Sequence, residues 1–129
     1  MRCLRIVAVA LLGLLPLSCA STMRDAVEGK EAGTAALYPV PPARAWSIAR
    51  AIVFAAAHFD VRSNRERTMI TCDAGTGTDT TYIAVWIEPG VDGSESRVTI
   101  RSVKEGGMQI TSVLTEEEFH ARFRERVGM

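Results

Sequence analysis

The chain has 129 residues, 47% of them hydrophobic, and its 15 basic and 15 acidic side chains give a formal net charge of zero. This length fits one domain, which is large enough to bury a core without metal or disulfide staples. The neutral charge balance argues against nucleic-acid binding and against a polybasic membrane-surface domain, both of which need a basic face.

The N-terminal segment has the organisation of an export signal. Arg2 and Arg5 precede an apolar stretch over residues 6–15. The positive charge keeps the start of the chain in the cytoplasm while the apolar stretch enters the translocon. A transmembrane helix needs about 20 apolar residues, so this stretch is too short to span a bilayer in the mature protein.

The next residues, Leu17-Ser18-Cys19-Ala20, resemble the lipobox of bacterial lipoproteins. This resemblance implies that residues 1–18 are cleaved and that Cys19 receives a diacylglyceryl group and an amine-linked acyl chain such as palmitate. Multiple acyl chains anchor a protein stably. Ala20, rather than Asp, implies delivery to the outer membrane, with the domain facing the periplasm. Pro16 stands where the lipobox usually has an aliphatic residue, and an ordinary cleaved signal or an uncleaved anchor are the alternatives.

Cleavage at this point removes Cys3. Cys72 then has no second cysteine for an intramolecular disulfide, and the three cysteines lack metal-ligand spacing. The sequence therefore predicts a buried thiol at Cys72 and no bound metal or other cofactor.

The predicted organisation after the signal is a tether over 19–34 followed by one domain over 35–129. The tether is polar, with Gly29 and Gly33 adding freedom, which predicts a flexible segment. Residues 36–40 could form a short edge strand, where Pro39 would be tolerated. A helix is predicted over 43–59, with a wide apolar face suited to packing on a sheet.

Short stretches rich in β-branched or alternating apolar residues follow this helix. They cover 60–63, 68–73, 82–88, 97–104 and 108–114. Turn-like residues separate them and no crossover helix intervenes, which predicts antiparallel hairpins.

The last element is a helix with a clear start. Thr115 is a good N-cap, and Glu118 completes a capping box. Phe119, Phe123 and Val127 recur at steps of four and predict a buried stripe. With four of these five stretches taken as strands, the element order is β-α-β-β-β-β-α. It predicts an α+β two-layer sandwich, an antiparallel sheet of four or five strands with two helices packed on one face.

The other face of such a sheet must be solvated or must bind something. In 82–88, Tyr82 and Trp86 lie on the opposite side from Ile83, Val85 and Ile87. Arg97 and Arg101 of the neighbouring strand share a face with one another. Tyr82, Trp86, Arg97 and Arg101 are therefore the predicted binding face. The alternative is that the tether covers this face, or that sheet twist buries Trp86 at an edge.

No catalytic constellation is evident. The stretch 75–78, Gly-Thr-Gly-Thr, lacks the spacing and the lysine of a phosphate loop and is predicted to be a hairpin loop. His58 and His120 are predicted at solvated helix positions, with too few neighbouring ligands for a metal. The sequence therefore predicts a protein that is not an enzyme.

The chain also resembles small Gram-negative envelope lipoproteins of unknown function. The resemblance rests on the lipidated cysteine, the polar tether, Pro42-Ala43-Arg44-Ala45-Trp46 and Arg67-Thr68-Met69-Ile70-Thr71. More remotely, its element order is similar to the repeated domain of BamC, a lipoprotein subunit of the barrel assembly machine. Neither resemblance implies a catalytic residue.

Together these features predict a non-enzymatic envelope lipoprotein. It would hold to the membrane through Cys19 and bind a protein partner, or itself, through the sheet face or an edge strand. The alternative is a small-ligand or lipid carrier with a pocket between the long helix and the sheet, because the many alanines of that helix leave room.

Overall fold

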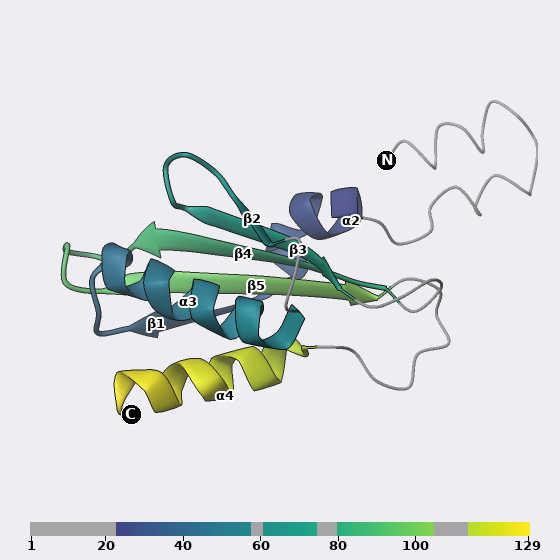
Figure 1. Ribbon diagram of the computed structural model, residues 1–129. Helices are drawn as coiled ribbons and strands as arrows, with labels where there is room; N and C mark the ends of the chain where they lie inside the picture. The colour runs from purple at the N-terminus through teal and green to yellow at the C-terminus, as the bar shows by residue number, and fades with distance from the viewer. Residues whose placement is uncertain (1–22, 58–60, 75–79, 105–113) are drawn as a thin grey trace, which may run out of the picture.

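The computed structural model describes residues 23–57, 61–74, 80–104 and 114–129. Its centre is a five-stranded antiparallel sheet with the order β1-β5-β4-β3-β2. The strands are β1 (Thr34–Tyr38), β2 (Val61–Ser63), β3 (Met69–Ala74), β4 (Thr81–Pro89) and β5 (Ser96–Lys104). Helices α3 (Pro42–Ala57) and α4 (Glu116–Val127) cover one face of this sheet (Figure 1). The predicted α+β sandwich is confirmed.

The predicted edge strand over 36–40 is present, but it lies two residues earlier in the chain. β1 begins at Thr34, ends before Pro39, and pairs with β5 at the edge of the sheet. Residues 108–113 of the last predicted strand lie outside the described residues, as do 58–60 and the predicted hairpin loop over 75–78. Leu114 is buried but is not part of a strand.

The core lies between the sheet and helices α3 and α4. Pro42 occupies the first helical position of α3, where a missing N–H costs nothing. Trp46, Ala49 and Val53 of α3 are buried, whereas Ala55 is exposed. The sheet contributes the alternate residues of β3, β4 and β5. They are Ile70, Cys72, Ala74, Ile83, Val85, Ile87, Val98 and Ile100. The predicted burial of Cys72 is thus confirmed.

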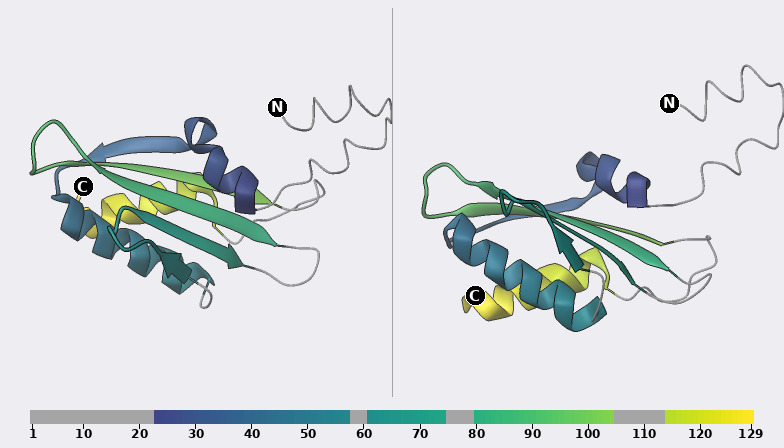
Figure 2. Two further views of the ribbon diagram at one scale, coloured as in Figure 1. Left: turned by 90° about the horizontal axis from the view of Figure 1, so that it is seen from above. Right: turned by 45° about the horizontal axis from the view of Figure 1, so that its top comes forward.

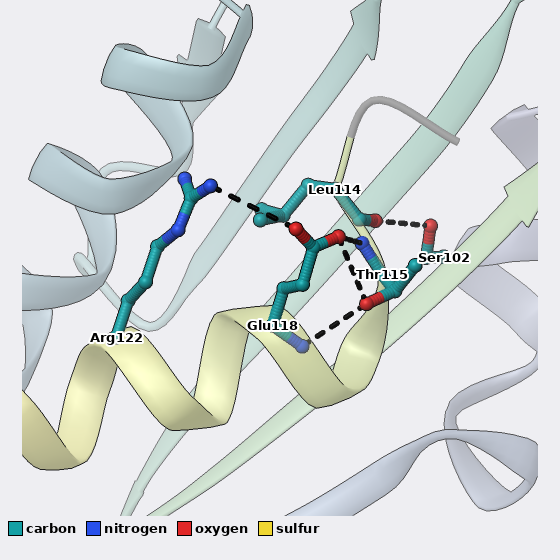
Figure 3. A network of polar contacts seen from close by, with 5 residues as sticks. All are labelled: Ser102, Leu114, Thr115, Glu118 and Arg122. Carbon is teal, nitrogen blue, oxygen red and sulfur yellow. Dashed lines mark hydrogen bonds and ion pairs between the residues drawn. The ribbon is translucent and has the colours of Figure 1, made fainter. Parts of the chain in front are cut away.

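The capping box at the start of α4 forms as predicted (Figure 3). Glu118 N donates to Thr115 Oγ1 at 3.0 Å, and Thr115 N donates to Glu118 Oε1 at 3.2 Å. Ser102 Oγ donates to the Leu114 carbonyl at 2.8 Å, which ties this helix start to β5. Arg122 Nη2 lies 3.9 Å from Glu118 Oε2, one helical turn away.

The prediction that His120 is a solvated helix residue is wrong. His120 is only 4% exposed and lies between α4 and β1. Its Nε2 lies 2.9 Å from the Thr34 carbonyl, and its Nδ1 lies 2.5 Å from the Tyr38 hydroxyl. Because a carbonyl can only accept, Nε2 carries the proton, and the Tyr38 hydroxyl donates to Nδ1. Both ring nitrogens are therefore satisfied in the neutral imidazole.

The surroundings of His120 disfavour its charged form. Burial lowers the pKa of His120 below its ordinary value, and Arg124 lowers it further, against opposing contributions from the Thr34 carbonyl and Glu116. The rings of Tyr38 and Phe123 pack in a tilted arrangement with centroids 4.1 Å apart, and those of Tyr38 and His120 stack with centroids 5.8 Å apart. A proton on Nδ1 would displace the Tyr38 hydroxyl from its acceptor inside this aromatic cluster.

Acidification is therefore expected to destabilise the fold through His120. The unfolded chain takes up a proton below about pH 6.5, whereas the lowered pKa keeps the folded imidazole neutral to a lower pH. The free energy of unfolding should thus fall as pH drops through this window. Thermal melts from neutral to mildly acidic pH should show this fall, and His120→Gln should weaken it. His58 is present in both proteins, so an equally steep fall in the variant would contradict the assignment to His120.

Candidate functional site

A short N-terminal helix occupies the sheet face that α3 and α4 leave open (Figure 2). This helix is α2 (Met23–Glu28), and the 3-10 turn η2 (Lys30–Ala32) follows it. The prediction of a flexible tether through residue 34 is therefore wrong from Met23 onward. Cys19, with the other residues before Met23, lies outside the described residues.

The reason for this docking is a second apolar cluster on that face. Ala26 is fully buried, and it packs against Ala84 of β4 and Val103 of β5. The partly buried members of the cluster are Met23, Val27, Met69, Tyr82 and Trp86. The alternation in β4 places apolar side chains on both faces, so the second face needs a cover of its own.

The four residues of the predicted binding face do share one face of the sheet, but they are not equally available. Tyr82 and Trp86 are half-buried within the cluster under α2. Arg101 lies opposite Ala84 in the strand register and is also half-buried, whereas Arg97 lies opposite Glu88 and is exposed. Most of this face is therefore covered by the N-terminal segment, as in the alternative stated from the sequence.

Lys30 is a residue of this face that the sequence interpretation missed. Its Nζ lies 2.9 Å from Glu88 Oε2 and 6.0 Å from the centroid of the Trp86 ring. The lysine thus combines an ion pair with a cation–π contact that covers the exposed side of the tryptophan. No local pattern marks Lys30, because both of its partners lie on a strand more than fifty residues away.

Gly29 and Gly33, interpreted from sequence as sources of flexibility, are required by close contact. A Cβ at Gly33 would lie 2.5 Å from the Ile100 carbonyl oxygen, and one at Gly29 would lie 2.7 Å from the Asp25 carbonyl oxygen. Real Cβ atoms do not approach backbone oxygens so closely. Gly33 therefore lets the chain lie directly on β5, and Gly29 lets it turn closely at the end of α2.

The uncovered part of the face is a strip along β1 and the neighbouring end of β5. We call Ala35, Leu37 and Arg97 the β1 strip. Leu37 is 55% exposed and pairs with Arg97 across the two strands. A shallow groove lies between this strip and η2. Its lining comprises Lys30, Glu31, Gly33, Ala35, Glu88, Arg97 and Thr99.

The floor of this groove contains an unsatisfied polar atom. Thr99 is 4% exposed, and its Oγ1 has no hydrogen-bond partner among the described residues. Arg101 Nε, on the same strand, is also buried and has no hydrogen-bond partner among the described residues. A buried polar atom without a hydrogen-bond partner costs folding free energy. This end of the face therefore has hydrogen-bonding groups that the described residues do not satisfy.

The described residues contain no group of three or more His, Cys, Asp or Glu side chains that could hold a metal ion. Within the same ranges, no helix is long and apolar enough to cross a bilayer. Comparison of the chain with protein-family models, with curated proteins and with solved structures finds no match in any of the three.

The docking of α2 can be tested at its central contact. Ala26→Glu places a charge where Ala84 and Val103 allow no space or solvent, so α2 should leave the sheet. In a Trp46→Phe background, where Trp86 is the single emitter, we expect a loss of about 1–3 kcal/mol of unfolding free energy and a red shift of the Trp86 emission. Ala121→Glu, at an exposed position of α4, is the matched control and should change neither quantity. An Ala26→Glu protein with unchanged emission would show that Trp86 does not depend on α2 for its burial.

Proposed function

We propose that the chain is a non-enzymatic envelope lipoprotein that holds to the outer membrane through a lipid on Cys19 and presents its domain to a protein partner in the periplasm. The leader and the lipobox-like residues around Cys19 support the anchor. The exposed Leu37 on edge strand β1 is the observation that carries the interaction. It lies on a face that the chain otherwise covers with its own α2 and η2.

The chemistry of the β1 strip favours one kind of partner. An edge strand can accept an additional strand, and main-chain hydrogen bonds then supply affinity while side chains supply specificity. An apolar side chain of the partner would contact Leu37, and a carboxylate would pair with Arg97, which has no ion-pair partner among the described residues. The proposed partner segment is therefore extended, apolar and acidic.

The carrier hypothesis needs space between α3 and the sheet. In the described part of that interface, Ala49, Ile52 and Val53 of α3 are at most 1% exposed and belong to one continuous core with the strands. The small alanine side chains let α3 pack closely on the sheet, and they do not leave a pocket between the two in the described residues. The β1 strip is thus better supported than a pocket in this layer.

The anchor can be tested by mass spectrometry of the N-terminal peptide from membrane-extracted protein. We expect a peptide that begins at Cys19 and carries the mass of three acyl chains. Cys19→Ser should abolish that peptide and move the protein out of the membrane fraction, whereas Cys3→Ser, the matched control in the leader, should change neither. An unmodified peptide that begins after Cys19 would mean ordinary cleavage.

The interaction can be tested with a photo-reactive amino acid in place of Leu37, cross-linked in intact cells. We expect a cross-link to an acidic, extended segment of another envelope protein, identified by sequencing the joined peptide. Arg97→Glu should abolish the product through charge repulsion. Arg126→Glu, an exposed α4 position, is the matched control and should leave it unchanged. A cross-link to a second copy of the chain, or one that survives Arg97→Glu, would contradict the proposed partner.

A further inference from the structure

A second candidate site lies on the other side of the molecule, where α3 passes the β2–β3 hairpin. An open pocket of about 480 Å³ lies between these two elements. This volume is within the range of small-molecule sites. The lining comprises Trp46, Ser47, Arg50 and Ala51 of α3 with Ser63 and Arg67 of the hairpin. It shares no residue with the β1 strip or its groove.

The pocket contains two guanidinium groups without a balancing carboxylate. Arg50 and Arg67 both line it, and neither forms an ion pair among the described residues. The surroundings are basic as well. Residues 42–57 and 61–74 contain five arginines against two carboxylates, Glu66 and Asp73, although the whole chain is neutral. The two segments that form the pocket therefore carry a net positive charge.

The position of Arg67 is fixed by the hairpin backbone. Asn64 Oδ1 accepts from Thr68 N at 2.9 Å and from Met69 N at 3.0 Å, and Arg67 N donates to the Asn64 carbonyl at 3.2 Å. Arg67 has a φ of 59°, in the left-handed region that favours glycine or asparagine. An arginine here serves the turn less well than those residues, which points to a role for its side chain.

The floor of the pocket is preformed. Trp46 lines it while only 8% exposed, so its indole ring is held by the core and presents one border to the pocket. Ser63 adds a hydroxyl from the exposed end of β2. Guanidinium groups match the geometry of phosphate oxygens and bind them with paired charge-assisted hydrogen bonds. Serine hydroxyls donate to the same oxygens.

We propose that this pocket binds a phosphate group, with Arg50 and Arg67 as its charged ligands and Ser63 as a neutral donor. The same chemistry is offered by a soluble phosphate ester and by the headgroup of an anionic phospholipid. The proposal does not depend on the β1 strip or on the lipid anchor.

The full-length chain in a non-ionic detergent can report binding through Trp46. The chain has two tryptophans, Trp46 and Trp86, so Trp86→Phe leaves Trp46 as the single emitter. In this background, inorganic phosphate at constant ionic strength should give a saturable change of emission. Arg50→Gln should weaken the binding by about 10-fold or more, the effect expected for loss of a charged hydrogen bond.

Two further variants separate binding from folding and from general charge. Arg67→Asn removes the guanidinium but keeps a residue that tolerates positive φ, so it should weaken binding equally without lowering the melting temperature. Arg44→Gln and Arg65→Gln remove exposed arginines outside the pocket lining and should leave binding unchanged. Equal losses in these controls would mean non-specific surface charge and would overturn the proposal.

Vesicles distinguish the two sources of phosphate. A change of Trp46 emission with phosphatidylglycerol vesicles that is absent with phosphatidylcholine vesicles, and lost in Arg50→Gln, would identify the lipid headgroup. A response to inorganic phosphate alone would identify a soluble ligand. No saturable response to either probe would overturn the proposal.

Discussion

Strand β4 is the constraint on which the arrangement of this molecule depends. Its alternate residues are apolar toward α3 and α4, and also toward the opposite face, where Ala84 is completely buried. A sheet that is apolar on both faces has to be covered on both. Within the described residues this cover is unequal, with the long helices α3 and α4 on one side and the short α2 and η2 on the other (Figure 2). The short cover leaves β1 open, and the exposed Leu37 follows from that inequality.

The sequence predicted those parts of the fold that depend on local periodicity. The capping box at Thr115, the Phe119–Phe123 stripe and the hairpin strands all repeat or pair within a few residues, so their pattern is visible without the structure. The predictions that failed depend on partners far away along the chain. His120 looks like a surface residue because its partners, Thr34 and Tyr38, are 86 and 82 residues distant.

The candidate sites follow the same rule. Residue alternation along the strands was enough to predict that one face of the sheet carries Tyr82, Trp86, Arg97 and Arg101. The helix that covers this face could not be predicted, because α2 is short and has a small apolar surface. The pocket of Arg50 and Arg67 could not be predicted either, since it joins a helix to a hairpin. The one local signal there is an arginine in a turn that favours asparagine or glycine, and that signal needs the backbone angle to be seen.

With the proposed lipid on Cys19, the docking of α2 would also limit how far the domain can move from a membrane. The packed part of the chain begins at Met23, so four residue steps separate it from the proposed lipid on Cys19. A fully extended chain of that length spans about 14 Å, which is less than half the thickness of a bilayer's hydrocarbon core. With so short a connection, the anchored domain would stay at the headgroup surface and would not reach far into the periplasm. Its meeting with any partner then becomes a two-dimensional search among molecules that share the same leaflet.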